Sequence, residues 1–396
     1  MAVAGSAWAC GEEELSAEAE AFFVRHWHRP VPPQGPPPKG WAPVETDLDP
    51  SACGTCHAVQ YRDWSSTLHG GAYSPGLEGQ LAAWFDTDPA TVASCMGCHG
   101  PLTEQLRRIA AAPGPWVENP AYAPGLERQG VVCAACHVRE WRRYGPPRRD
   151  GTVHASPPGT PHDGAIRRTE FEDSRFCGAC HQFETPAPNG KPLENTLREW
   201  EATGFARRGV TCQACHMPDR RHTWRGIHDP EMTRSGVTPE WRVEGRSDDA
   251  GFRVRLALTN TGTGHFFPTY VTPAVDLEIA FLDTGGDTLE TRLRTLQRDA
   301  YFDGAEWIER EDDRIPPGET RALEWRGPAP RGAARVTGRV VVRPDAFYRD
   351  FFAQVLAVTP KGSAARPRLD EALVRTKTSP YELWRWEERL ATEGRG

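Results

Sequence analysis

Five copies of one short cysteine–histidine pattern constrain this chain more than any other feature. The pattern is Cys-x-x-Cys-His, and it uses ten of the 11 cysteines in the 396-residue sequence. At this spacing two thiols reach the vinyl groups on one porphyrin edge, and the next residue places an imidazole under the iron. The pattern predicts five covalent haem c groups, attached at Cys53, Cys56, Cys95, Cys98, Cys133, Cys136, Cys177, Cys180, Cys212 and Cys215, with proximal ligands His57, His99, His137, His181 and His216.

Three other interpretations of the pattern fit less well. Zinc ribbons combine two Cys-x-x-Cys pairs in one tetrahedral site, so five pairs would leave one pair without a partner. A thioredoxin-like redox site needs a βαβ context, which the sequence does not show. Disulfide bonds would leave the five following histidines unexplained. The sequence also has no Cys-x-x-Cys-Lys variant, so we expect no lysine-ligated haem.

The composition agrees with a core built partly from something other than side chains. The hydrophobic share is 38%, and glycine (38 residues) and proline (36 residues) are abundant, which indicates long loops. Haem macrocycles would supply the missing apolar bulk. The formal charge of −7 argues against nucleic acid as a partner, and we expect no transmembrane segment because no apolar window is long enough.

The compartment follows from the attachment chemistry. Haem c is attached to exported apoprotein, so we expect a periplasmic, outer-membrane-associated or extracellular protein. The N-terminal apolar piece is too short for a complete secretory signal, which indicates a truncated signal. Its end, Ala7-Trp8-Ala9-Cys10-Gly11, is similar to the end of a bacterial lipoprotein signal. Cys10 is therefore a candidate lipid anchor, and a free thiol is the alternative.

Most candidates for the distal axial ligand of each haem iron are also histidines. Beyond the five proximal histidines the chain has eight more, but only 4 methionines, so bis-histidine ligation is favoured. Such ligation implies low potentials, because methionine ligation raises them. The predicted distal ligands are His69, His162, His222, His228 and His265, and the alternatives are His154, His26 and His28.

Local spacing supports some of these choices. Tyr61, Trp64 and Leu68 recur at helical intervals, which predicts a helix from the first motif towards His69. Twelve helical residues rise about 18 Å, whereas two histidines on one iron have Cα atoms only about 13 Å apart. His69 must then serve a different haem from His57.

Two loops supply further candidates. Pro218 breaks any helix after the fifth motif, leaving a loop that presents His222 and His228 to neighbouring irons. His162 lies in a loop rich in proline and glycine and is preferred over His154.

The predicted fold is an α+β multidomain protein. Residues 1–45 form a tether with a proline-rich linker, and residues 46–238 form a pentahaem domain of short helices and loops around stacked haems. Period-two alternation, as in Phe252, Val254 and Leu256, predicts an antiparallel β-sandwich over residues 239–362. Residues 363–396 form a tail, where the capping box Ser379-Pro-Tyr-Glu382 predicts a short terminal helix.

Between Trp41 and Pro360 the chain resembles the multihaem cytochrome c family typified by cytochrome c-554. The resemblance rests on the segment from Tyr61 to His69, on the residues around Cys177, on Cys215-His216-Met217-Pro218, and on Gly264-His265-Phe-Phe-Pro268-Thr269. It implies that His69 and His265 are distal ligands. Cytochrome c-554 has fewer haems and no β-sandwich, so its redox partner does not transfer. Hydroxylamine-oxidising multihaem enzymes are similar only at a greater distance.

These observations favour an electron-transfer protein that works between redox partner proteins. The alternative is a reductase or oxidoreductase in which one open haem acts on a small nitrogen or sulfur compound. In that case a basic cluster would help bind an oxyanion, although such a run is also typical of a solvated surface. A third interpretation makes the β-sandwich a docking module, compatible with either function. The cluster consists of Arg139, Arg142, Arg143, Arg148 and Arg149.

Overall fold

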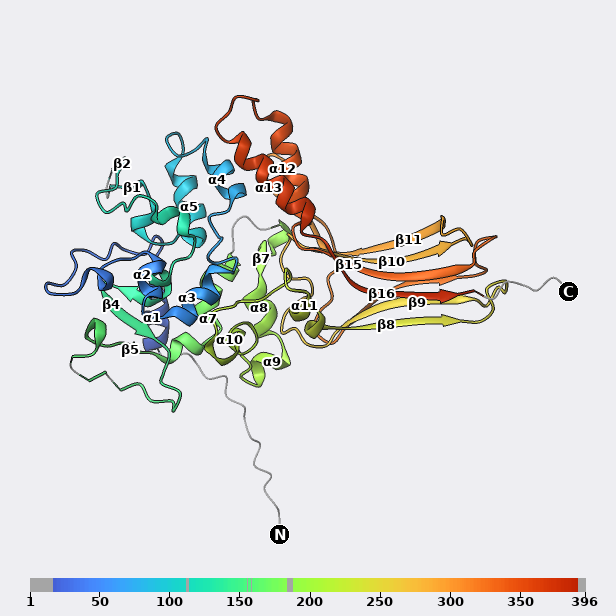
Figure 1. Cartoon of the computed structure of the whole chain (residues 1–396), viewed down its shortest axis with the longest axis horizontal. Coiled ribbons are helices and arrows are strands. Elements are labelled where there is room, and N and C mark those ends of the chain that lie inside the picture. The colour runs from blue at the N-terminus through green and yellow to red at the C-terminus, as the bar shows by residue number, and fades with distance from the viewer. Residues whose placement is uncertain (1–16, 112–113, 155, 158, 184–187, 391–396) are drawn as a thin grey trace, which may run out of the picture.

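The chain folds into a part with short helices and long loops, followed by a part with long strands (Figure 1). The structure is a computed structural model that describes residues 17–111, 114–154, 156–157, 159–183 and 188–390. Cys10 lies outside the described residues. None of the described helices is long and apolar enough to cross a membrane.

Short helices carry the five motifs. Two of these helices begin with proline behind an aspartate cap: the Asp49 carboxylate accepts a hydrogen bond from the Ser51 amide, and the Asp88 carboxylate accepts one from the Thr91 amide. The caps define where each helix starts and therefore where its cysteines project. The motif helices are α2 (Pro50–Gly54), α5 (Pro89–His99), α6 (Cys133–His137), α7 (Arg175–His181) and α10 (Cys212–His216).

The remaining elements of this part are also short. The other helices are α1 (Ala17–His26), α3 (Ala58–Ser65), α4 (Pro75–Leu81), α8 (Thr196–Glu201), α9 (Gly204–Arg207) and α11 (Pro230–Gly236). The strands are β1 (Arg108–Ala110), β2 (Trp116–Glu118), β3 (Val138–Arg139), β4 (Arg142–Gly145), β5 (Ile166–Arg167), β6 (Gln182–Phe183) and β7 (Glu194–Asn195). The 3₁₀ helices are η1 (Pro43–Glu45), η2 (Thr103–Gln105), η3 (Leu126–Gln129), η4 (Pro161–Asp163), η5 (Thr169–Glu172), η6 (Pro188–Gly190) and η7 (Pro218–Arg220).

Two antiparallel sheets share one hydrophobic core in the second part. One sheet has the order β11-β10-β15-β16 and the other β14-β9-β8, with β12 and β13 as a separate pair. The alternation predicted from the sequence is observed, because Val254, Leu256, Leu277 and Ile279 are fully buried between the sheets. The strands are β8 (Val237–Glu244), β9 (Arg253–Asn260), β10 (Ala274–Leu282), β11 (Thr288–Leu296), β12 (Arg298–Phe302), β13 (Trp307–Asp312), β14 (Thr320–Arg326), β15 (Arg335–Arg343) and β16 (Tyr381–Arg389).

The helix predicted from Ser379 is a strand instead. Residues Tyr381–Arg389 form β16, which pairs with β15 and buries Leu383 in the shared core. The capping box was overridden because the edge of β15 offers a full ladder of backbone hydrogen bonds. A helix does lie near the C-terminus, but earlier, as α13 (Arg366–Thr378) after α12 (Ala346–Val358).

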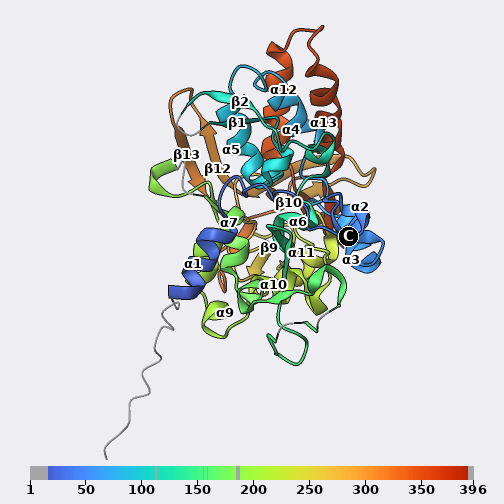
Figure 2. The same ribbon diagram turned by 90° about the vertical axis from the view of Figure 1, so that its left-hand side faces the viewer.

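Helices α12 and α13 connect β15 to β16 and pack on the first part of the chain. Figures 1 and 2 both show them beside α4. Two glycines on α4 make the close approach possible: a Cβ on Gly76 would lie 2.4 Å from the Phe352 ring, and one on Gly79 would lie 2.8 Å from Leu369. The contact brings α12 close to the second motif, which ends α5.

Candidate haem-binding sites

Three of the motif histidines are oriented by backbone carbonyls. The Nδ1 atom of His99 lies 2.8 Å from the Ala72 oxygen, and that of His137 lies 2.8 Å from the Tyr144 oxygen. The Nδ1 atom of His216 makes the same contact with a carbonyl, at 2.7 Å. Because a carbonyl only accepts, each Nδ1 carries the proton and each Nε2 keeps a free lone pair. These rings therefore present the nitrogen that an iron ligand needs.

Three motif histidines also face a second histidine ring. Ring centroids are 6.1 Å apart for His69 and His181, 6.2 Å for His137 and His222, and 6.4 Å for His216 and His265. Two imidazoles on one metal, with bonds of about 2 Å and about 1.1 Å from nitrogen to ring centre, have centroids about 6.2 Å apart. The donor set and its spacing fit a haem iron between each pair.

Burial keeps several of these imidazoles neutral. It lowers the pKa of His69 to about 3, and the pKa values of His137 and His181 to about 4. A buried imidazolium would lose hydration without a compensating anion, so the neutral form is favoured. Neutral imidazole is also the form that binds a metal ion.

Helix α3 helps to position one of the opposing histidines. It ends at Ser65, so His69 lies in the following turn, near the fourth motif rather than its own. On the same helix, the buried Asp63 carboxylate accepts two hydrogen bonds of 2.6 Å from the Arg221 guanidinium and one of 3.2 Å from the His222 amide. Nothing in the sequence pattern indicated this contact, which joins residues 158 positions apart.

His162 lies within electrostatic range of His57, the proximal histidine of the first motif. Its backbone amide donates to Glu45 Oε1 at 2.9 Å, and its Nδ1 lies 3.4 Å from the same oxygen. Burial is the main cause of its lowered pKa. The carboxylate of Glu45 thus orients His162, a role that sequence reasoning did not assign.

The other candidate histidines have different surroundings. His228 Nε2 lies 3.0 Å from Asp345 Oδ1, and no motif histidine is paired with it in the described part of the chain. His26 is buried among aromatic rings, with Nε2 2.8 Å from the Cys136 oxygen. His154 is exposed. The structure thus brings His69, His222 and His265 to motif histidines but not His228.

His99 differs from the other buried motif histidines. Burial lowers the pKa of His99, and the hydrogen bond with the Ala72 carbonyl only partly opposes this effect. No neighbouring histidine contributes to the shift. Among the described residues, no histidine ring is paired with it. Glu194 and Tyr270 lie instead within electrostatic range of the preceding Cys98.

Cysteines of different motifs lie close together. Three pairs of thiols interact directly across motifs, so the corresponding attachment edges are neighbours in space. These pairs join the first motif to the third, the second to the fourth, and the fourth to the fifth. They are Cys53 with Cys133, Cys98 with Cys180, and Cys177 with Cys212.

Several arginines of the predicted basic cluster contact the backbone. Arg139 donates to the Ala135 carbonyl at 2.9 Å, and Arg143 donates to the Glu45 carbonyl at 2.6 Å. Arg149 donates to the carbonyl of residue 219 at 3.2 Å. These guanidinium groups therefore brace loops around the motifs.

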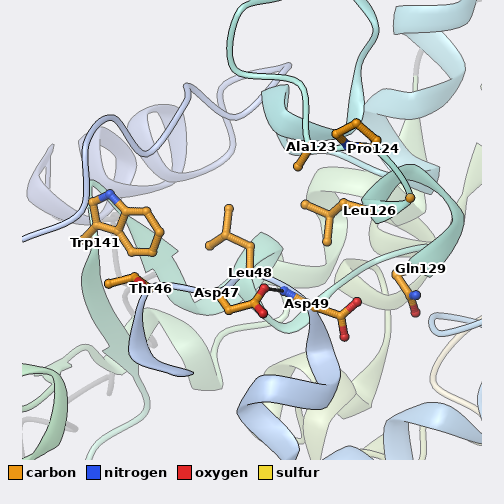
Figure 3. Close-up of a pocket in the computed structure, with 10 residues that line it drawn as sticks. Thr46, Asp47, Leu48, Asp49, Ala123, Pro124, Leu126, Gln129 and Trp141 are labelled. Carbon is orange, nitrogen blue, oxygen red and sulfur yellow. Dashed lines mark hydrogen bonds between the residues drawn. The ribbon is translucent and has the colours of Figure 1, made fainter. Parts of the chain in front are cut away.

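A surface cleft of about 460 Å³ lies beside the first motif helix (Figure 3). Asp47, Leu48 and Asp49 line one side and Trp141 another, and the Asp49 amide donates to Asp47 at 2.8 Å. None of the lining residues is a cysteine or a histidine. The cleft is separate from the histidine pairs.

Comparisons with known proteins found a family model and a solved structure that the chain resembles. The family model "Cytochrome c554 and c-prime" matches residues 52–138. Among solved structures, the chain is similar to a penta-heme cytochrome c552 from Thermochromatium tepidum, with a TM-score of 0.61 and 18% sequence identity. The similarity covers 88% of this chain and 100% of that chain. No curated protein matches the sequence.

Proposed function

We propose that the chain is a multihaem cytochrome c that transfers electrons between extracytoplasmic redox partners through five covalently bound haems. Haem c, when bound, supplies one-electron redox chemistry, and bis-histidine ligation without methionine keeps its potential low. The protein's own part is to attach, orient and space these groups.

The observation that carries this proposal is the set of three histidine pairs at 6.1, 6.2 and 6.4 Å. Each pair joins a motif histidine to a histidine from another segment. We propose His69, His222 and His265 as distal ligands at the fourth, third and fifth motifs. For the first motif we propose His162, because it lies near His57 and is oriented by Glu45.

The neighbouring thiols support a relay rather than five isolated centres. They link the first motif to the third, the second to the fourth, and the fourth to the fifth. Cys136 also lies within electrostatic range of Cys177, which connects the third motif to the fourth. All five attachment sites thus belong to one connected set, as a path for electrons between two partner proteins requires.

A second candidate function has one specific observation in its favour. In the described part of the chain His99 has no histidine opposite it, and tyrosine and glutamate side chains lie near its motif. A haem ligated on one side only would leave room for a small nitrogen or sulfur compound. The protein would then be a reductase or oxidoreductase whose other haems supply electrons.

One experiment separates the two functions. The haem content of the purified full chain is measured first, and five haems are expected. The electron paramagnetic resonance spectrum of the oxidised protein is then recorded with and without cyanide, nitrite and hydroxylamine. Low-spin signals that no addition changes support the relay alone. A high-spin signal that shifts with these additions refutes a pure relay and assigns a substrate site.

We also propose that the protein works outside the cytoplasm and that Cys10 carries a lipid. Mass spectrometry of the N-terminal peptide from protein purified out of a native host tests the anchor. An acylated Cys10 supports it, and an unmodified thiol at the same position contradicts it.

A further inference from the structure

Three titratable side chains gather at the second motif and have no role in the histidine pairs. Glu194 on β7 is only 7% exposed. It lies within electrostatic range of Cys98, as does Tyr270 in the loop before β10. Tyr348 on α12 interacts with Cys95 and is hydrogen-bonded to Tyr270. The first part of the chain, the β-rich part and the connecting helix thus all contribute to this cluster.

A hydrogen-bonded chain leads from Glu194 to a second buried carboxylate. The Thr196 hydroxyl donates to Glu194, and its oxygen lies 2.7 Å from the Thr269 hydroxyl. Thr269 in turn donates to Glu199 Oε2 at 3.4 Å. Two hydroxyl protons cannot supply three hydrogen bonds, so the line from Glu194 to Glu199 is complete only when Glu194 is protonated and donates to Thr196.

A series of ion pairs between side chains connects the second carboxylate, that of Glu199, to the protein surface. Arg314 donates to Glu199 Oε1 at 2.8 Å and to Asp312 at 2.7 Å. Asp312 is 2.6 Å from the Lys191 ammonium, whose side chain is 36% exposed. Arg314 keeps Glu199 paired, whereas Glu194 has no cation in direct contact among the described residues. Of the two carboxyl groups that Thr196 and Thr269 connect, only Glu199 thus has a cation that balances a negative charge.

The surroundings of Glu194 favour its protonated form. Burial raises the pKa of Glu194 to about 8, with Glu199 adding to the shift and Thr196 and Arg314 opposing it. The other facing groups are Tyr270 and Tyr348, whose pKa values burial also raises, so both are neutral at physiological pH. A carboxyl group with such a pKa exchanges a proton near neutrality when the local charge changes.

We propose that Glu194 takes up one proton when an electron enters the haem attached at Cys95 and Cys98, with Thr196 and Thr269 as the proton route. An electron taken up at this motif would remove one positive charge within electrostatic range of Glu194 and would so strengthen proton binding by its carboxylate. One electron from a donor protein and one proton from solvent are consumed, and the Glu194 carboxylate becomes a carboxylic acid. Oxidation by an acceptor protein reverses both. The inference rests on haem attachment at the second motif, part of the proposed function, and applies to a relay and to a reductase alike.

The test is a redox titration of the haem-loaded full chain at several pH values around the pKa of Glu194, about 8. In the unmodified protein one midpoint potential falls by up to about 59 mV for each pH unit, the one-electron equivalent of a tenfold change in proton concentration. In Glu194→Gln that slope is lost. The matched control is Glu127→Gln, another buried glutamate (5% exposed) that is paired with Arg107, and it keeps the slope. An unchanged slope in Glu194→Gln overturns the proposal.

A second measurement needs no variant. Infrared difference spectra of reduced minus oxidised protein should gain a carboxylic acid band that shifts in heavy water, and Glu194→Gln should lose it. Thr196→Val should slow proton uptake while keeping the equilibrium slope. If the unmodified protein shows neither the band nor a pH-dependent potential, the inference fails. Because haem content is measured on the same sample, five haems with pH-independent potentials refute only this inference, whereas missing haems refute the proposed function.

Discussion

Replacing Asp63 with asparagine should detach the loop that carries His222. Asp63 is 5% exposed and makes two hydrogen bonds of 2.6 Å to Arg221 and one of 3.2 Å to the His222 amide. A hydrogen bond to a charged group contributes about 1.5–3 kcal/mol. Because the Arg221 side chain is 49% exposed, solvent screening weakens the pair, and we expect a total loss of about 2 kcal/mol. That loss corresponds to about a 30-fold weaker docking of the loop.

The effect should depend on pH. The hydrogen bonds from Arg221 hold the pKa of Asp63 below its ordinary value. The stabilisation is therefore fully present above about pH 4, the range in which an unfolded aspartate is ionised. It is lost as the pH falls through the lower pKa of the folded state. The difference in free energy of unfolding between the unmodified protein and Asp63→Asn should thus be constant near neutral pH and should fall towards zero at acidic pH.

Two measurements on the haem-loaded protein check this prediction. Urea unfolding followed by circular dichroism reports the lost free energy, and electron paramagnetic resonance reports a new high-spin fraction where His222 no longer faces His137. Asp219→Asn is the matched control, because it also removes one carboxylate charge near Arg221, but one that interacts with this guanidinium only through its charge. If Asp63→Asn unfolds at the same urea concentration as the control and stays fully low-spin, the clamp does not position His222.

Three further outcomes are expected. His265→Ala should add one high-spin, cyanide-binding haem to the electron paramagnetic resonance spectrum, whereas His228→Ala, at a histidine bound to an aspartate, should add none. Serine at both cysteines of the second motif should lower the haem-to-protein ratio by one in a pyridine haemochrome assay. Gly76→Ala should cost about 1–3 kcal/mol, because its Cβ would lie 2.4 Å from a ring on α12. The resulting drop in thermal midpoint should be absent in Gly362→Ala, where nothing lies within 4 Å.

Local chemistry made the attachment sites and much of the β-rich part predictable. The thiol spacing and the following histidine are set within five residues, so each motif can be recognised without any knowledge of its surroundings. Strand alternation is equally local, and it correctly identified buried positions such as Val254 and Leu256. The family match, in contrast, covers residues 52–138 alone.

Tertiary structure decided which histidines meet and how the chain ends. His69 faces His181 because helix α3 stops at Ser65 and the chain turns towards another motif. The Asp63 clamp joins residues 158 positions apart, which no local pattern encodes. The segment from Tyr381 became a strand because β15 offered an unpaired edge, whose hydrogen bonds outweighed the local helix signal. Covalent spacing is a property of neighbouring residues, whereas ligand pairing and strand pairing depend on how the whole chain packs.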